Sequence, residues 1–135
     1  MRAPTVPASH THLLDAATAV LATNGPDGRP QLTAVWFLRD GDRVRLSLST
    51  DRQKVKNLRA DPAVNLFILD PEVPTRYLEI RGDATFEDDP GYVFADQVGA
   101  KYGTDRRNFD TEGTRRVVVS IEPTRINAVD MLAGH

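Results

Sequence analysis

The sequence predicts a small antiparallel β-barrel with peripheral helices, in a mainly β chain. Short apolar runs of β-forming residues recur along the chain, separated by clusters of Gly, Asp and Pro. These runs number about six or seven, which is typical of a small barrel. The chain has 135 residues, of which 40% are hydrophobic and 27% charged, as expected for one globular domain over residues 1–135.

The N-terminal part predicts an arm, a short helix and three strands. Residues 1–8 contain two prolines and show no periodicity, which is typical of a flexible arm. Ser9 can cap a short helix that ends near Ala19. The three strands that follow are separated by tight turns rich in Gly and Asp, so they are expected to pair consecutively as an antiparallel meander. Their ranges are 19–23, 31–38 and 44–49.

The C-terminal part predicts two helices and the remaining strands. One helix is expected from Asp51 to Ala60, because the Asp61-Pro62 pair ends it. A second helix has Pro90 at its favoured first position and Gly103 just past its end. A polar, mobile loop is expected at 104–114. The strands are expected at 64–69, at 77–86 with a bulge or bend at Gly82, at 116–122 and at 126–129.

Two of the predicted strands are apolar on both faces. Residues 31–37 and 64–69 carry apolar side chains at both odd and even positions. A barrel strand needs only one face inside the barrel. The outer face is therefore expected to be covered by a helix, a partner subunit or a flat cofactor.

A cationic segment from Arg52 to Arg59 contains four Lys or Arg residues and no acid, in a chain of net charge -2. One interpretation is a solvated amphipathic helix. The other is an anion site, because cations in the first helical turn oppose the helix dipole unless an anion binds. The preceding strand places the hydroxyls of Ser47 and Ser49 on one face, where they can donate hydrogen bonds. Since Arg and Lys bind phosphate well, the segment is a candidate phosphate site.

Several classes of function are disfavoured by what the sequence lacks. The absence of Cys excludes disulfides and thiolate chemistry. No apolar run is long enough to cross a membrane, and the net negative charge disfavours sequence-independent binding to nucleic acids. A cytoplasmic protein without membrane or nucleic-acid partners is expected.

No catalytic template is complete in the sequence. His10, His12 and His135 lie near the chain ends and predict no metal site. A nucleophile elbow and a Gly-rich phosphate loop are both missing. The catalytic residues stay unknown, and a catalytic role would require a cofactor.

Several motifs occur together between residues 19 and 81: Leu21-Ala22-Thr23, Gly28-Arg29-Pro30-Gln31, Val35-Trp36-Phe37, Ser49-Thr50, Arg52-Gln53-Lys54, Asn57-Leu58-Arg59 and Asp61-Pro62. This combination resembles the flavin and deazaflavin oxidoreductases of the pyridoxamine 5'-phosphate oxidase-like split β-barrel. It is most similar to the group B, PPOX-class coenzyme F420-dependent oxidoreductases. The resemblance implies a split β-barrel of six to seven antiparallel strands, a homodimer, and a cofactor in each of two clefts between the subunits.

The resemblance also implies roles for individual residues. The cofactor phosphate would be held by Arg52 and Lys54, with Asn57 beside them. Hydroxyl contacts are implied for Ser47, Ser49 and Thr50. The strand residues Thr33, Ala34, Val35 and Trp36 would run along the ring system of the cofactor. Tyr77 would lie where the partner subunit approaches the ring.

Three functions are compatible with these residues. The first is a reductase in which reduced coenzyme F420 gives a hydride to a small electron-poor organic substrate, with Lys56 and Arg59 as extra positive charge for the polyglutamyl tail. The second is an FMN-binding flavin reductase or pyridoxamine-phosphate-oxidase-like enzyme. The third is a non-catalytic carrier of F420 or FMN. The fold alone does not decide among them.

Overall fold

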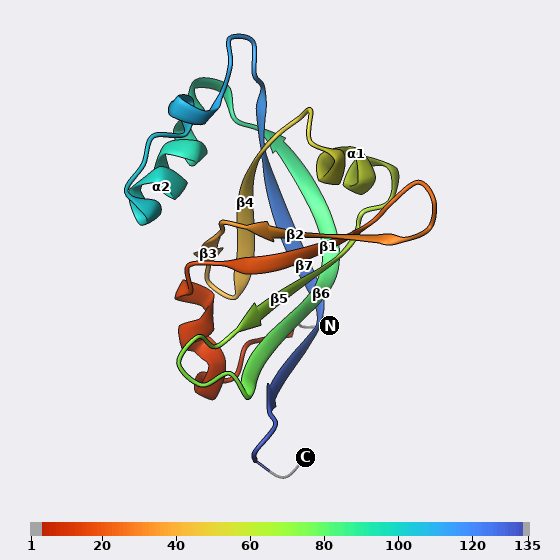
Figure 1. Ribbon diagram of the computed structural model, residues 1–135, viewed down its shortest axis with the longest axis vertical. Coiled ribbons are helices and arrows are strands. Elements are labelled where there is room, and N and C mark those ends of the chain that lie inside the picture. The colour runs from red at the N-terminus through yellow and green to blue at the C-terminus, as the bar shows by residue number, and fades with distance from the viewer. Residues whose placement is uncertain (1–3, 134–135) are drawn as a thin grey trace.

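The computed structural model describes residues 4–133 and shows one seven-stranded antiparallel sheet (Figure 1). The order of the strands in the sheet is β2-β1-β5-β6-β7-β4-β3. In chain order the strands are β1 (Ala19–Asn24), β2 (Pro30–Val35), β3 (Leu38–Asp40), β4 (Arg43–Ser49), β5 (Ala63–Leu69), β6 (Arg76–Asp88) and β7 (Arg116–Asp130).

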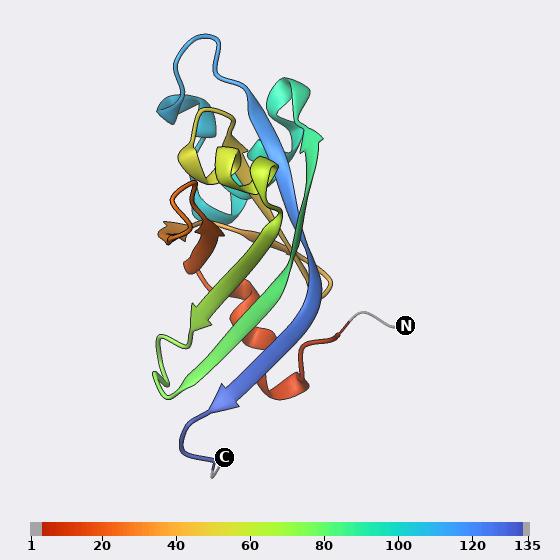
Figure 2. The ribbon, with the colours of Figure 1, turned by 90° about the vertical axis from the view of Figure 1, so that its right-hand side faces the viewer.

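The sheet curls so that its two edge strands come together. β2 and β3 are the edge strands, yet only Trp36 and Phe37 separate them in the chain. Phe37 is fully buried at this junction. The long strands β6 and β7 curve together (Figure 2), with a register shift between Arg81 and Gly82 where a bulge is predicted. The result is a curled half-barrel, which confirms the predicted mainly β, split-barrel fold.

The helices lie on the outside of this sheet. Asp89 caps α2, because its two carboxylate oxygens each accept a backbone N–H bond of 2.9 Å, from Phe94 and Ala95. Gly103, with φ 69°, ends the helix as the sequence predicts. No helix within residues 4–133 is long and apolar enough to cross a membrane. The helices are α1 (Gln53–Ala60) and α2 (Val93–Tyr102), with 3-10 helices η1 (Ala8–Asp15), η2 (Pro90–Tyr92) and η3 (Arg106–Phe109).

Two apolar clusters hold these elements together. The main core fills the curl of the sheet and includes Val55 and Leu58, which α1 turns inward. A second, smaller cluster joins α2 to β7 through Phe94, Val98 and Val118, with Trp36 and Tyr102 packed against it. α1 and α2 are thereby fixed on either side of β4 (Figure 1).

The predicted meander of three consecutive strands is wrong. β2 pairs with β1, but β4 pairs with β3 and β7. The expected strand 31–38 is interrupted at Trp36 and Phe37, where the Phe37 N–H donates to the Tyr102 hydroxyl at 3.0 Å instead of to a strand. This interruption turns the chain from one edge of the sheet to the other.

Three smaller expectations are also corrected. The first helix is a 3-10 helix that ends at Asp15 rather than near Ala19. The two strands expected at 116–122 and 126–129 are the single strand β7, because its pairing with β6 continues past the bulge. The loop 104–114 contains η3.

Part of the predicted N-terminal arm contacts the body of the protein. Val6 is buried, and its backbone N–H donates to the Asp42 carboxylate at 3.1 Å. Residues 1–3 of the predicted arm lie outside the described residues.

Candidate functional site

A cavity of about 340 Å³ opens between the ends of β2 and β4, the first turn of α1, and the segment that joins α2 to β7. Its lining contains four cations and no carboxylate. The lining residues are Ala34, Val35, Trp36, Ser47, Leu48, Ser49, Arg52, Lys54, Val98, Arg106 and Arg116.

Two of the cations come from the start of α1. Arg52 is the N-cap residue and Lys54 lies in the first turn. The Lys54 ammonium donates to the Thr33 hydroxyl at 3.3 Å. Burial, together with the charge of Arg52, lowers the pKa of Lys54. A group whose charged form is disfavoured in this way gains from a bound anion.

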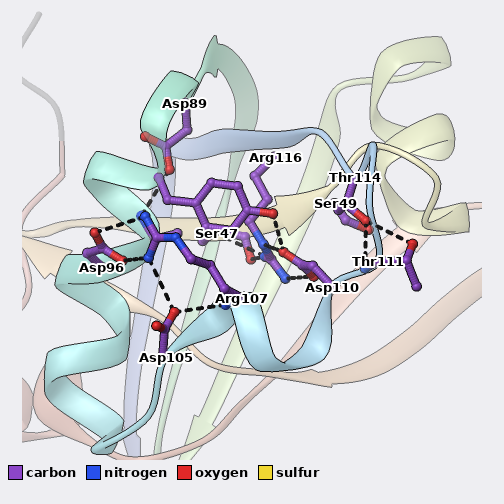
Figure 3. A network of polar contacts seen from close by, with 12 residues as sticks. Ser47, Ser49, Asp89, Asp96, Asp105, Arg107, Asp110, Thr111, Thr114 and Arg116 are labelled. Carbon is purple, nitrogen blue, oxygen red and sulfur yellow. Dashed lines mark hydrogen bonds and ion pairs between the residues drawn. The ribbon is translucent and has the colours of Figure 1, made fainter.

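Arg116, by contrast, already has its counterion. Its guanidinium forms a two-point contact with the buried Asp110 carboxylate, at 2.7 Å through Nε and 2.8 Å through Nη2. The remaining nitrogen donates to the Ser47 carbonyl and hydroxyl, both at 3.2 Å, and the Tyr92 hydroxyl donates to Asp110 at 2.6 Å (Figure 3). This network anchors segment 104–115 to β4. Arg116 therefore lines the cavity in a structural role, with its charge already neutralised by Asp110.

Arg106 has no such partner. Its guanidinium carbon lies 5.1 Å from the centre of the Trp36 ring, and its Nε is buried without a hydrogen-bond partner. Burial, followed by the nearby charge of Arg116, lowers the pKa of Arg106. Arg106 is therefore a third cation of the cavity without a counterion, in addition to Arg52 and Lys54 of the α1 start.

Trp36 lines the cavity, and its ring is supported from behind the lining by Tyr102 of α2. The Trp36 and Tyr102 rings are stacked, with centroids 4.2 Å apart and an angle of 4° between their planes. The Tyr102 hydroxyl both accepts from the Phe37 N–H and donates to the Phe37 carbonyl, at 3.0 and 3.2 Å. α2 therefore positions the end of β2 that lines the cavity.

The structure brings most of the sequence-predicted site residues together. The predicted residues that line the cavity are Ala34, Val35, Trp36, Ser47, Ser49, Arg52 and Lys54. Thr33 does not line it, but its hydroxyl accepts a hydrogen bond from Lys54, which does.

The hydroxyl groups are used differently from the prediction. The Ser49 hydroxyl donates to Asp51, so its hydrogen points away from the cavity. Ser47 accepts from Arg116 and keeps its own hydrogen free to donate. Thr50 lies in a neighbouring hollow, and its N–H donates to the Arg115 carbonyl at 2.9 Å.

Asn57 and Tyr77 do not line the cavity of this chain. The buried Asn57 amide donates to Thr23 at 3.1 Å and to Gln31 at 3.3 Å, which ties α1 to β1 and β2. Tyr77 opens the opposite end of the sheet, where its ring centroid is 5.1 Å from that of Phe67.

Sequence reasoning missed Arg106 and Arg116, which come from segments distant in the chain. The adjacent Arg pair at 106–107 and the pair at 115–116, on either side of a polar loop, were the available signal. A count of charges could not separate the cavity residues from Arg107, which pairs with Asp96 at 2.6 Å outside the cavity.

The lining suits a flat molecule that carries an anionic group. An unneutralised cation pair, a buried Nε without a partner and the Trp36 side chain in the lining are the features that a phosphate-bearing ring cofactor would use. Among residues 4–133, no group of His, Asp and Glu side chains is arranged to hold a metal ion.

The fold and the cavity together define a split-barrel protein with a cationic cofactor cleft. The family model for pyridoxamine 5'-phosphate oxidase matches residues 7–130. The chain belongs to this family of oxidoreductases. No curated protein matched the sequence significantly.

Solved structures agree with this assignment. An F420 reductase is 34% identical with a TM-score of 0.78, over 90% of this chain and 98% of that one. The conserved hypothetical protein Rv2991 from Mycobacterium tuberculosis is 27% identical with a TM-score of 0.77, over 96% of this chain and 88% of that one. General Stress Protein 26 from Bacillus anthracis, at 18% identity and a TM-score of 0.69, shares the fold over 89% of this chain and 90% of that one.

Proposed function

We propose that this chain is an F420-dependent oxidoreductase that reduces a small electron-poor organic substrate. The observation that carries the proposal is the cavity, whose lining contains four cations, the Trp36 side chain and no carboxylate. The similarity to an F420 reductase over nearly the whole chain supports F420 rather than FMN.

Each part of the cavity has a distinct role in this proposal. Arg52 at the mouth and the half-buried Lys54 bind the cofactor phosphate, and the free Ser47 hydroxyl hydrogen adds a donor. The backbone from Ala34 to Trp36 lies along the ring system, and the apolar side chains exclude water. Reduced F420, when bound, supplies the hydride.

The cationic residues at the end of the segment are less suited to the polyglutamyl tail than the sequence suggests. The Arg59 guanidinium lies over the Phe86 ring, 4.5 Å from its centre, and does not line the cavity. Lys56 is exposed and free to contact a tail. The tail contact is therefore proposed for Lys56 alone.

The same proposal includes a homodimer. The outward side chains of β5 remain exposed in the single chain, Phe67 by 36% and Leu69 by 45%. They line an apolar hollow of about 390 Å³ with Val20 of β1. Tyr77 contacts Phe67 at this face, so a partner seated here would lie beside the tyrosine.

The proposal is tested by fluorescence titration of the purified protein with F420 and with FMN. We expect F420 to bind with a micromolar Kd, more tightly than FMN. Arg52→Ala and Lys54→Ala should each weaken F420 binding by about 1–3 kcal/mol, as lost charged hydrogen bonds. Arg125→Ala, an exposed cation outside the cavity, is the matched control.

Equal or tighter binding of FMN would contradict the F420 assignment. Unchanged affinity in both α1 variants would contradict the phosphate contact. Anaerobic oxidation of bound reduced F420 by added electron-poor alkenes would distinguish a reductase from a carrier.

A further inference from the structure

Arg106 is a cavity cation that the phosphate contact does not require. It comes from η3, whereas Arg52 and Lys54 come from the start of α1. Its guanidinium lies against the Trp36 ring at 5.1 Å and the Phe109 ring at 5.7 Å. Stacking on aromatic rings holds the plane of the guanidinium and leaves its N–H edge for hydrogen bonding.

The surroundings of Arg106 offer no acid to pair with it. The charge of Asp110 acts on Arg106, but both Asp110 oxygens are already bonded to Arg116, and one also accepts from Tyr92. Among residues 4–133, Arg106 forms no ion pair, and its Nε is buried without a partner. A buried Nε–H group that lacks a partner costs free energy unless a ligand supplies the acceptor.

A comparison with the neighbouring Arg107 shows that the lack of a carboxylate partner is specific to Arg106. Arg107, next in the chain, does not line the cavity and pairs with both Asp96 and Asp105 (Figure 3). The chain therefore places carboxylates for one arginine of the pair and none for the other. An oxyanion from outside the chain is the remaining partner for Arg106.

We propose that Arg106 forms a second oxyanion site of the cavity, apart from Arg52 and Lys54, and that it binds a carboxylate of the substrate. The substrate class is then an electron-poor organic acid, held by its carboxylate against the Trp36 end of the cavity. This inference rests on the proposed function, in which Arg52 and Lys54 already bind the cofactor phosphate. The alternative is that Arg106 binds a carboxylate of the polyglutamyl tail of F420.

Trp36 gives a direct readout, because it is the one tryptophan of the sequence and Arg106 lies on its ring. The experiment follows the single indole N–H resonance by NMR during titration with crotonate and with crotonamide. The two probes have nearly the same shape and differ in charge. Each titration is run on the free protein and on protein saturated with F420.

The expected result is that crotonate shifts the indole resonance in both states and crotonamide binds at least about tenfold more weakly. Arg106→Gln should weaken crotonate by at least about tenfold while changing the Kd of F420 by less than about twofold. Arg106→Lys should recover part of the crotonate affinity, because it restores the charge but not the planar edge. Arg107→Gln is the matched control and should leave both Kd values unchanged.

The outcomes separate the two proposals. Loss of F420 affinity in Arg106→Gln, with crotonate unable to bind the F420-saturated protein, would assign Arg106 to the cofactor and overturn the substrate inference. Equal binding of crotonate and crotonamide would also overturn it. Failure of wild-type protein to bind F420 would instead contradict the proposed function, while the titrations of the free protein would still test Arg106.

Discussion

The Trp36 indole lies parallel to the Tyr102 ring, with 4.2 Å between the ring centroids and 4° between the planes. The same tyrosine exchanges hydrogen bonds with the backbone of Phe37. One side chain of α2 thus fixes both residues that join β2 to β3. Because this junction brings the edges of the sheet together, Tyr102 supports both the cavity lining at Trp36 and the closure of the sheet.

Tyr102→Phe should therefore destabilise the protein while it preserves the stack. The substitution leaves the Phe37 N–H without its acceptor at a largely buried position, which costs about 1–3 kcal/mol. The free energy of unfolding from urea titration is the measurement. Tyr77→Phe, at the other end of the sheet, should change it by less than about 0.5 kcal/mol. An equal effect of the two substitutions would contradict the role of Tyr102.

Asn57→Ala should cost stability rather than direct cofactor contacts. The buried Asn57 amide bonds Thr23 and Gln31, and its oxygen accepts from Gln53 at 2.8 Å. Removal of the amide leaves the buried Thr23 hydroxyl without this donor, at a cost of about 1–3 kcal/mol. Urea unfolding measures the loss, with the exposed Asn108→Ala as control. A drop in F420 affinity without a loss of stability would contradict this structural role and would indicate that Asn57 contacts the cofactor.

Asp110→Asn should destabilise the protein in a pH-dependent way. Hydrogen bonds from Arg116 hold the pKa of Asp110 below its usual range. Its contribution to stability is therefore fully present above the unfolded-state pKa, near 4, and is lost as the pH falls toward the folded-state pKa. Since the substitution leaves the buried Arg116 charge unpaired, the loss at pH 7 should be about 3–5 kcal/mol.

Thermal or urea unfolding of wild type and Asp110→Asn from pH 7 to pH 3 measures this difference. The gap between the two proteins should shrink below about pH 4. Asp96→Asn, which breaks an exposed ion pair with Arg107, is the control and should cost no more than about 1 kcal/mol. A gap that stays constant down to pH 3 would show that the carboxylate charge is not what stabilises the network.

Gly82→Ala should be poorly tolerated because of the bulge between β6 and β7. A Cβ atom at Gly82 would lie 2.2 Å from the carbonyl oxygen of Glu122, which is backbone and cannot rotate away. Accommodation requires a shift of the two strands, at a cost of about 1–3 kcal/mol. Circular dichroism during urea unfolding measures it, with the exposed neighbour Asp83→Ala as control. Equal stability of the two variants would contradict this view of the bulge.

The sequence predicts elements here better than it predicts their pairing. Alternation and turn chemistry place β4, β5 and α2 close to their observed bounds, because those signals are local. The meander failed because the break at Trp36 depends on a tyrosine hydroxyl from α2, which no local pattern in β2 reveals. The same limit explains the site: Arg52 and Lys54 follow from their place at a helix start, whereas Arg106 is brought to Trp36 only by the folded chain.

The position of β7 in the sheet also bears on how the molecule assembles. The β3–β4 hairpin joins the rest of the sheet through β7, the last strand in chain order among residues 4–133. The hydrogen bond from Arg116 to the Ser47 carbonyl joins residues that are 69 positions apart in the chain. Pairings over such long stretches of chain slow folding. This side of the cavity is therefore complete only when β7 has paired with β4.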